Sequence, residues 1–523
     1  SNAGATTGNA NVEAYVLANG DQTFTLGAGG QDVTTGSGAV IIDTGSVADI
    51  TDASLDGTAA TTSMTINLAA NTDISDATIK GTAGNADANY AVTLASGVNA
   101  TMTSAQNSLI SSASGTNIVT LSAAAAAAGN ANVEAYVLAN GDQTFTLGAG
   151  GQDVTTGSGA VIIDTGSVAD ITDASLDGTA ATTSMTINLA ANTDISDATI
   201  KGTAGNADAN YAVTLASGVD ATMTRAQHLL VSSASGDNTV TLSNAGATTG
   251  NANVEAYVLA NGDQTFTLGA GGQDVTTGSG AVIIDTGSVA DITDASLDGT
   301  AATTSMTINL AANTDISDAT IKGTAGNADA NYAVTLASGV NATMTSAQNS
   351  LISSASGTNI VTLSAAAAAA GNANVEAYVL ANGDQTFTLG AGGQDVTTGS
   401  GAVIIDTGSV ADITDASLDG TAATTSMTIN LAANTDISDA TIKGTAGNAD
   451  ANYAVTLASG VDATMTRAQH LLVSSASGDN TVTLSNAGAT TGNANVEAYV
   501  LANGDQTFTL GCLLYTSPSP RDR

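Results

Sequence analysis

Short stretches of this chain alternate between apolar and polar residues. Apolar side chains stand at every second position, with threonine or asparagine in many of the places between them, in five stretches: Phe24 to Leu26, Val40 to Ile42, Met64 to Leu68, Tyr90 to Leu94 and Val119 to Leu121. A period of two with many β-branched residues is typical of strands that bury one face. Most of these stretches run into small residues, which favour turns. The pattern predicts an all-β chain.

One long stretch of sequence recurs along the chain. The text that begins at Asn9 restarts at Asn130, Asn251, Asn372 and Asn493, so the repeat length is 121 residues. We therefore predict the end of a truncated repeat at 1–8, repeats at 9–129, 130–250, 251–371 and 372–492, the start of a fifth repeat at 493–511, and a separate tail at 512–523. The repeats are called copies one to five below.

Copies one and three agree with each other, and so do copies two and four. The differences that we find between the two types lie in the last quarter of the copy: Asn99 is replaced by Asp220, Ser104 by Arg225, Asn107 by His228, Ser108 by Leu229, Ile110 by Val231, Thr116 by Asp237, Ile118 by Thr239, and the alanines at 123–128 by NAGATT at 244–249. A position that accepts both alanine-rich and Gly/Thr-rich text suits a connector better than a helix.

A shorter period lies inside each copy. The text from Asp49 to Leu55 is echoed from Asp73 to Ile79, and both segments lead into an alternating strand. The apolar residues that close the predicted strands follow one another at intervals of 16 to 27 residues: Leu26, Ile42, Leu68, Leu94, Leu121 and Leu147. Strand modules repeated at such intervals predict a parallel β-helix, or β-solenoid, in which each coil buries its inner face on the next coil. We expect about five coils per copy on this spacing.

A tandem array of β-sandwich domains is the alternative fold. Asn19-Gly20 separates two apolar stretches, which is a strong signal for a hairpin of antiparallel strands, although Asn-Gly also suits a corner between coils. The two folds differ in whether the strand at Phe24 pairs in parallel or antiparallel with its neighbours. Thr103 and Gln106 have capping-box spacing, which predicts one short helical turn.

Both ends of the sequence depart from the repeat pattern. Residues 512–523 read CLLYTSPSPRDR and contain the only cysteine and both prolines of the chain. Residues 512–522 resemble the translation of a transposase-type sequencing adapter, which implies a non-native tail. Residues 1–8 match 243–250, so the sequence begins inside the array, and we interpret it as a fragment of a longer metagenomic gene. The repeats contain no apolar run of about 18 residues, so no membrane span is predicted in them.

The chain is strongly acidic, and this narrows the possible functions. It has 47 acidic residues against 8 lysines and arginines, a net charge of −39. Such a surface repels nucleic acid and favours solubility and association with cations. Only two histidines are present, His228 and His470, and no nucleophile with a base is apparent. We therefore expect no catalytic and no cofactor-binding residues. Repeats without cysteine fit an extracellular bacterial protein.

Calcium is the candidate ligand. The segment from Gly27 to Asp43 resembles the glycine-rich nonapeptide calcium repeats of type I secreted bacterial proteins, because Gly30-Gln31-Asp32 matches their motif, although Val40 stands where the next ligand is expected. That resemblance implies calcium in the turns of a parallel β-roll. A second set of aspartates would form acidic ladders between coils. The candidate metal ligands are Asp32, Asp43, Asp49, Asp52, Asp73 and Asp76. The alternative is a metal-free turn and a solvated acidic face.

The chain as a whole resembles the long Ala/Gly/Thr/Asp-rich repeat regions of bacterial surface proteins, such as large adhesins, S-layer-like proteins and autotransporter-like passengers. That resemblance implies an extracellular, β-rich stalk with a structural and adhesive function, whose partners are a surface ligand or neighbouring surface proteins. Two alternatives stay open. One is a calcium-binding secretion module. The other is a β-helical polysaccharide lyase or hydrolase, which near-identical copies disfavour because an active-site cleft needs one distinctive set of residues.

Overall fold

Short parallel strands make up most of the computed structural model, which describes residues 4–50, 52–292 and 294–510. The all-β class predicted from the sequence is confirmed. The chain divides into two units, residues 1–244 with 251–260 and residues 245–250 with 261–523. The predicted adapter-derived tail at 512–523 lies outside the described residues.

In the first unit the strands form several parallel sheets, whose members are as follows. One sheet contains β1 (Ala5–Thr7), β3 (Gln22–Thr25), β5 (Ala39–Asp43), β7 (Ser63–Leu68), β10 (Ala91–Leu94) and β12 (Ile110–Ala113). A second contains β2 (Ala14–Val16), β4 (Asp32–Thr34), β6 (Ser54–Asp56) and β9 (Thr78–Lys80). A third contains β8 (Thr72–Asp73), β11 (Ala100–Met102), β13 (Ile118–Leu121), β15 (Ala135–Val137), β17 (Asp153–Thr155), β19 (Ser175–Asp177) and β22 (Thr199–Lys201). A fourth contains β14 (Ala127–Ala128), β16 (Gln143–Thr146), β18 (Ala160–Asp164), β20 (Ser184–Leu189), β23 (Ala212–Leu215) and β25 (Val231–Ala234). Further pairings join β21 (Thr193–Asp194), β24 (Ala221–Met223), β26 (Thr239–Leu242) and β28 (Ala256–Val258).

The second unit repeats these elements. One sheet contains β27 (Thr248–Thr249), β29 (Gln264–Thr267), β31 (Ala281–Asp285), β33 (Ser305–Leu310), β36 (Ala333–Leu336) and β38 (Ile352–Ala355). β30 (Asp274–Thr276), β32 (Ser296–Asp298) and β35 (Thr320–Lys322) pair in that order. Another sheet contains β34 (Thr314–Asp315), β37 (Ala342–Met344), β39 (Ile360–Leu363), β41 (Ala377–Val379), β43 (Asp395–Thr397), β45 (Ser417–Asp419) and β48 (Thr441–Lys443). Another contains β40 (Ala369–Ala370), β42 (Gln385–Thr388), β44 (Ala402–Asp406), β46 (Ser426–Leu431), β49 (Ala454–Leu457) and β51 (Val473–Ala476). The last strands are β47 (Thr435–Asp436), β50 (Ala463–Met465), β52 (Thr481–Leu484) and β54 (Ala498–Val500), and β53 (Ala489–Thr491) with β55 (Thr507–Thr509).

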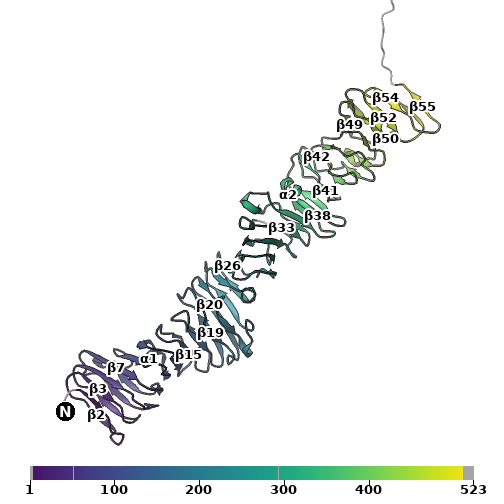
Figure 1. The fold of residues 1–523 in the computed structure, drawn as a ribbon. Coiled ribbons are helices and arrows are strands. Elements are labelled where there is room, and N and C mark those ends of the chain that lie inside the picture. Colours follow the sequence, from purple (N-terminus) through teal and green to yellow (C-terminus); the bar gives the residue numbers. More distant parts are fainter. Residues whose placement is uncertain (1–3, 51, 293, 511–523) are drawn as a thin grey trace, which may run out of the picture. The chain divides into compact units, whose positions relative to one another are not determined.

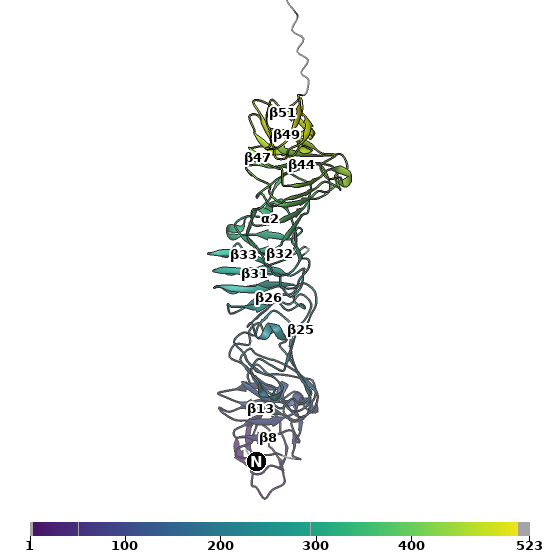
Figure 2. The ribbon, with the colours of Figure 1, turned by 90° about the vertical axis from the view of Figure 1, so that its right-hand side faces the viewer.

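Strands that neighbour each other in these sheets run in the same direction. β3 pairs in parallel with β1 and with β5, and β2 pairs in parallel with β4. Asn19-Gly20 therefore does not join an antiparallel hairpin, because each of its flanking strands takes partners elsewhere. It forms a corner: Gly20 donates its N–H to Ser37 O at 2.7 Å, and Asn19 Oδ1 accepts the Ser37 N–H at 3.0 Å. Figure 2 shows the same direction of β31 and β33 in the second unit.

The core consists of inward side chains in register from strand to strand. In the first sheet Phe24 lies opposite Ile42, Ile42 opposite Ile66, and Ile66 opposite Val92. All four side chains are at most 1% exposed. The residues between them point outward, as the period of two predicts. The strands lie next to one another in Figure 1 as successive layers of the first unit, from β3 to β7.

Sheets continue across the boundary between copies. β13 at the end of copy one pairs with β15 in copy two, where Val119 lies opposite Tyr136. β14 and β16 also span this boundary, with Ala127 opposite Phe145. In the second unit β39 and β41 join copies three and four in the same way. The end of the sequence repeat at residue 129 is therefore not the end of a sheet.

The short internal repeat also pairs with itself. β6 lies beside β9, with Leu55 opposite Ile79, as the echo of the two segments suggests. Copy one contributes five strands to the first sheet, β3, β5, β7, β10 and β12, because β1 lies in residues 1–8. The strand predicted at Val119 and Leu121 is confirmed as β13, which pairs with β11 and β15 on another sheet.

Helical segments are short. The predicted capping box forms in α1 (Ser104–Ser108): Thr103 Oγ1 accepts the Gln106 N–H at 3.2 Å, and Gln106 Oε1 accepts the Thr103 N–H at 2.9 Å. α2 (Ser346–Ser350) is its equivalent in copy three, and copies two and four have 3₁₀ turns there, η3 (Gln227–Leu230) and η6 (Gln469–Leu472). The remaining 3₁₀ turns are η1 (Thr82–Gly84), η2 (Thr203–Gly205), η4 (Thr324–Gly326) and η5 (Thr445–Gly447). None of the helices in the described ranges is long and apolar enough to cross a membrane.

Candidate functional site: acidic positions and polar ladders

Asp32 and Asp43 bind their own chain. Asp32 begins β4, and its Oδ1 accepts the Ser54 N–H at 2.8 Å. Asp43 ends β5, where Oδ1 accepts the Gly45 N–H at 2.7 Å and Oδ2 accepts a hydrogen bond from Asn67 Nδ2 at 2.7 Å. These carboxylates satisfy backbone and amide donors of neighbouring layers, so part of their acceptor capacity is already used.

Of the other four candidate ligands, Asp73 ends β8, and Asp49, Asp52 and Asp76 lie in the segments before β6 and β9. Asp49 and Asp73 form a parallel bridge through their backbones, and Asp73 Oδ1 accepts hydrogen bonds from Ser75 N at 2.9 Å and Ser75 Oγ at 2.7 Å. Asp52 and Asp76 are exposed. Among the described residues, no three His, Cys, Asp or Glu side chains lie together as a group that could hold a metal ion. Calcium binding at these positions stays a prediction that this geometry does not favour.

The motif that resembles a calcium turn has a different use in the fold. Val33, next to the matched Asp32, is fully buried in β4. Gln31 is 2% exposed, and its Nε2 donates to Asn9 O at 2.7 Å and Val12 O at 2.8 Å, while its Oε1 accepts the Gly27 N–H at 2.8 Å. The buried Gln31 side chain therefore holds two neighbouring layers together through hydrogen bonds to their backbones. Sequence reasoning missed this role, because a buried glutamine inside a glycine-rich motif has no periodic signal.

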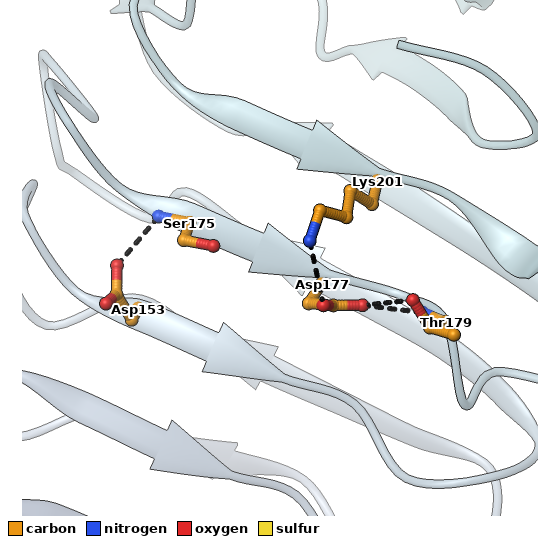
Figure 3. A network of polar contacts seen from close by, with 5 residues as sticks. All are labelled: Asp153, Ser175, Asp177, Thr179 and Lys201. Carbon is orange, nitrogen blue, oxygen red and sulfur yellow. Dashed lines mark hydrogen bonds and ion pairs between the residues drawn. The ribbon is translucent and has the colours of Figure 1, made fainter. Parts of the chain in front are cut away.

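A carboxylate–lysine pair recurs once in every complete copy, and Figure 3 shows it in copy two. Asp177 Oδ1 accepts hydrogen bonds from Thr179 N at 2.9 Å and Thr179 Oγ1 at 2.5 Å, and Asp177 Oδ2 lies 3.4 Å from Lys201 Nζ. In the same view Asp153 Oδ1 accepts the Ser175 N–H at 2.7 Å. The hydrogen bonds from Thr179, with the charge of Lys201, hold the pKa of Asp177 below its usual value.

The lowered pKa of these aspartates predicts a loss of stability in strong acid. A carboxyl group whose pKa is lower in the folded state stabilises the fold above the unfolded value of about 4 and loses that contribution as the pH falls further. We expect a variant with Asn at Asp56, Asp177, Asp298 and Asp419 to show a weaker dependence of unfolding on pH below about 4. Circular dichroism between pH 2 and 5 measures this dependence.

The matched control places Asn at the exposed turn positions Asp76, Asp197, Asp318 and Asp439. Equal effects of the two sets would contradict a specific role of the Thr- and Lys-bonded carboxylates.

Outward polar side chains form ladders across the strands. Asn188 Nδ2 donates to Asp164 Oδ2 at 2.7 Å, and Thr214 Oγ1 donates to Asn188 Oδ1 at 2.7 Å, so one chain of hydrogen bonds crosses β18, β20 and β23. The same ladder joins Asp43, Asn67 and Thr93 in copy one. Because these groups bind one another, the ladder stiffens the sheet surface and presents no activated nucleophile.

Beside the ladder, the same sheet carries a shallow, mixed apolar and hydroxyl-rich surface. Thr144, Ile162 and Thr186 lie opposite one another on neighbouring strands, and Ile162 is 40% exposed. They belong to a depression lined by Ala126, Asp142, Gln143, Thr144, Ala160, Ile162, Ser184 and Thr186. We call the rows equivalent to Thr144, Ile162 and Thr186 the Thr-Ile-Thr rows. Copy one repeats them at Thr23, Ile41 and Thr65.

Comparisons of the chain with protein-family models, with curated proteins and with solved structures find no match.

Proposed function

We propose that this chain is a structural and adhesive repeat segment of a bacterial extracellular surface protein, that its copies stack as a parallel β-solenoid, and that it carries out no catalysis. The observation that carries the proposal is the continuation of parallel strand pairing across the copy boundaries, as between β13 and β15. A chain built this way gains length with each copy, while every inner face is covered by the next layer.

The recurrence of one surface supports the adhesive part of the proposal. The Thr-Ile-Thr rows occur in each complete copy, with an exposed isoleucine at Ile41, Ile162, Ile283 and Ile404. Several weak contacts of one kind on a single chain bind a surface far more tightly than one contact does. A strongly acidic surface and repeats without cysteine fit an extracellular location.

X-ray scattering of the whole chain tests the architecture. The cross-sectional radius does not depend on how the two units are joined. We expect it to be the same for the full chain and for a variant that lacks residues 9–250, because a solenoid keeps its section when layers are removed. Separate closed domains on linkers would give no constant cross-section and would contradict the proposal.

Calcium titration separates the proposal from the rival secretion module. We expect the far-ultraviolet circular dichroism to be that of a folded β protein in EDTA and to change little when calcium is added, because the core and the ladders close without a metal. A transition from coil to strand on adding calcium would favour the rival instead.

Binding of beads coated with the chain to bacterial cells tests adhesion. A variant with Ser at Ile41, Ile162, Ile283 and Ile404 removes the exposed apolar side chains and is expected to reduce bead retention. Variants with Ser at Ile118 and Ile360, which are exposed on another sheet, serve as controls. Equal retention of beads coated with the unmodified chain, the four-site variant or the control variants would show that the Thr-Ile-Thr rows are not the adhesive surface.

A further inference from the structure

Copies two and four contain a buried histidine that copies one and three lack. His228 and His470 are 0% exposed and lie in the 3₁₀ turns η3 and η6. The equivalent residues in the other copies are Asn107 and Asn349, in the helices α1 and α2.

The ring of His470 joins copy four to copy five. His470 Nδ1 lies 3.3 Å from Tyr499 Oη, and His470 Nε2 lies 2.9 Å from Thr490 Oγ1. Tyr499 Oη also accepts the Asn493 N–H at 2.8 Å. Asn493 Nδ2 in turn donates to His470 O at 3.0 Å. The histidine and its own carbonyl therefore both bind the first coil of the next copy.

The contact at His228 is closely similar. His228 Nδ1 lies 3.2 Å from Tyr257 Oη, and the two rings meet edge to face with centroids 5.5 Å apart. Asn251 of copy three donates its N–H to Tyr257 Oη at 2.7 Å and its Nδ2–H to His228 O at 3.2 Å. Both copies of this type thus end in the same histidine–tyrosine contact.

The contact fits a neutral imidazole. Burial raises the pKa of the Tyr499 hydroxyl, so this group stays an O–H. The Tyr499 hydroxyl accepts the Asn493 N–H and can donate its own proton to an unprotonated Nδ1, which leaves Nε2–H to donate to Thr490. A protonated ring has N–H on both sides, so the Nδ1–H and the tyrosine O–H would then compete as two donors.

The asparagine in the other copies makes the same connection with no group that titrates. Asn349 Oδ1 accepts the Tyr378 O–H at 2.9 Å, and Asn349 Nδ2 donates to Ala370 O at 2.8 Å. Asn107 has the same two partners in copy one, Tyr136 and Ala128. Two kinds of copy boundary therefore exist in one chain, and they differ in their dependence on protons.

We propose that the contacts of His228 and His470 hold each copy of the second type to the copy that follows it and weaken when the ring is protonated, so that mild acid loosens every second copy boundary. A boundary of this kind recurs every 242 residues, which is the length of the repeating pair. Loosening there would expose the first coil of the next copy and leave the asparagine boundaries closed.

The charges around the rings set the direction of the effect. Burial, together with the positive charge of Arg225, lowers the pKa of His228 from 6.5 to about 4, and burial lowers the pKa of His470. Among the described residues, Tyr257 and Arg225 are ionisable groups that act on His228, and Tyr499 is an ionisable group in contact with His470. The unfolded segment binds the proton more tightly, so both contacts have their full strength above about pH 6.5 and weaken below it, and the His228 contact loses its strength as the pH falls towards 4.

Hydrogen exchange of the full chain at pH 7.5, 6 and 5 tests the proposal. Segments 227–242 and 469–484 have the same sequence and report the histidine boundaries, while 106–121 and 348–363 report the asparagine boundaries. Taking the ratio of the two classes at each pH removes the intrinsic pH dependence of exchange. We expect the histidine segments to exchange on the order of tenfold faster, relative to the asparagine segments, at pH 5 than at pH 7.5.

Two variants make the outcome decisive. In the first, His228→Asn and His470→Asn remove the titrating rings. In the second, residues 220–249 and 462–491 carry the text of 99–128, a natural sequence whose fold is already present in copy one. Both variants are expected to lose the extra exchange at pH 5. Equal responses of the two boundary classes in the unmodified chain, or an unchanged response in the second variant, would overturn the proposal.

Discussion

Replacing Gln152 with Ala is expected to open the first layers of copy two locally. The side chain is 1% exposed, and its Nε2 donates to Asn130 O at 2.7 Å and to Val133 O at 2.8 Å, while its Oε1 accepts the Gly148 N–H at 2.8 Å. Alanine removes the side-chain partner of the Gly148 N–H and of Val133 O, while Asn130 O keeps the Val133 N–H at 3.0 Å, and each group left unsatisfied costs about 1–3 kcal/mol. We expect the local free energy of opening to fall by about 3 kcal/mol or more.

Hydrogen exchange resolves this effect although the copies are nearly identical. The substitution changes the mass of every peptide that spans residue 152, so those peptides are distinguished from their equivalents in the other copies. A loss of about 3 kcal/mol corresponds to exchange more than a hundredfold faster. Thr155→Ala is the matched control, because Thr155 is exposed on the neighbouring strand β17. Similar exchange in the two variants would show that Gln152 does not fasten the layers.

Replacing Phe145 with Ala is expected to have an effect of similar size through the core. The ring is fully buried, lies opposite Ala127 and Ile163 on the flanking strands, and packs against Tyr136 with centroids 4.8 Å apart. Removal of a buried phenylalanine ring costs about 3–5 kcal/mol, through lost burial and the cavity that remains. The cavity would lie between neighbouring layers and weaken their packing. Peptides across residues 140–150 are therefore expected to exchange at least a hundredfold faster.

Thr144→Ala is the control for the phenylalanine prediction. Thr144 precedes Phe145 on the same strand, β16, and points outward. The same peptides report both variants, so differences in digestion do not affect the comparison. If Thr144→Ala accelerates exchange as much as Phe145→Ala does, the core column through Phe145 is not what holds these layers together.

The long strands could be predicted from the sequence because their side chains alternate over several residues. Ser63–Leu68 places Met64, Ile66 and Leu68 inward, and the period of two is plain across six residues. The pairing of β6 with β9 was also indicated, because two similar segments follow each other at a short interval. Parallel stacking places equivalent residues of such segments opposite one another.

The short strands could not be predicted, since a strand with one inward side chain has no period. β4 buries only Val33, and the glycine-rich text around it favoured a turn with calcium instead. β14 contains two alanines, and alanine carries little preference for strands. β12 buries Ile110 and exposes two serines. These strands form because the layers on either side offer free N–H and C=O groups.

The candidate site shows the same limit for polar residues. The sequence indicated which positions carry carboxylates and left open what they bind. Asp43 and Asn67 stand one layer apart at the ends of their strands, and only the register of β5 with β7 shows that they bind each other. The Asp56–Lys80 pair had a weak signal, because Lys80 is the single cation of its copy. A buried His–Tyr contact between copies had none.

The residues that distinguish the second type of copy fit one another. Arg467 donates from Nη1 to Ala489 O at 2.9 Å, and a Cβ added at Gly488 would lie 2.6 Å from that nitrogen. The Arg467 N–H binds Asn486 Oδ1 at 2.9 Å, and His470 meets Thr490. In copy three these places hold Ser346, Ala365, Ala367, Asn349 and Ala369.

All of these matched positions fall between residues 467 and 490, inside a short stretch of the gene. Unequal crossing-over between copies, anywhere in the roughly one hundred codons that all copies share, would transfer the set as a block. The tyrosine that bonds the asparagine or the histidine of the preceding copy, as Tyr378 and Tyr499 do, occurs at the same position in every copy. Recombination can therefore add or delete whole copies in any order and leave compatible partners at every copy boundary. The length of the array is then free to vary between generations.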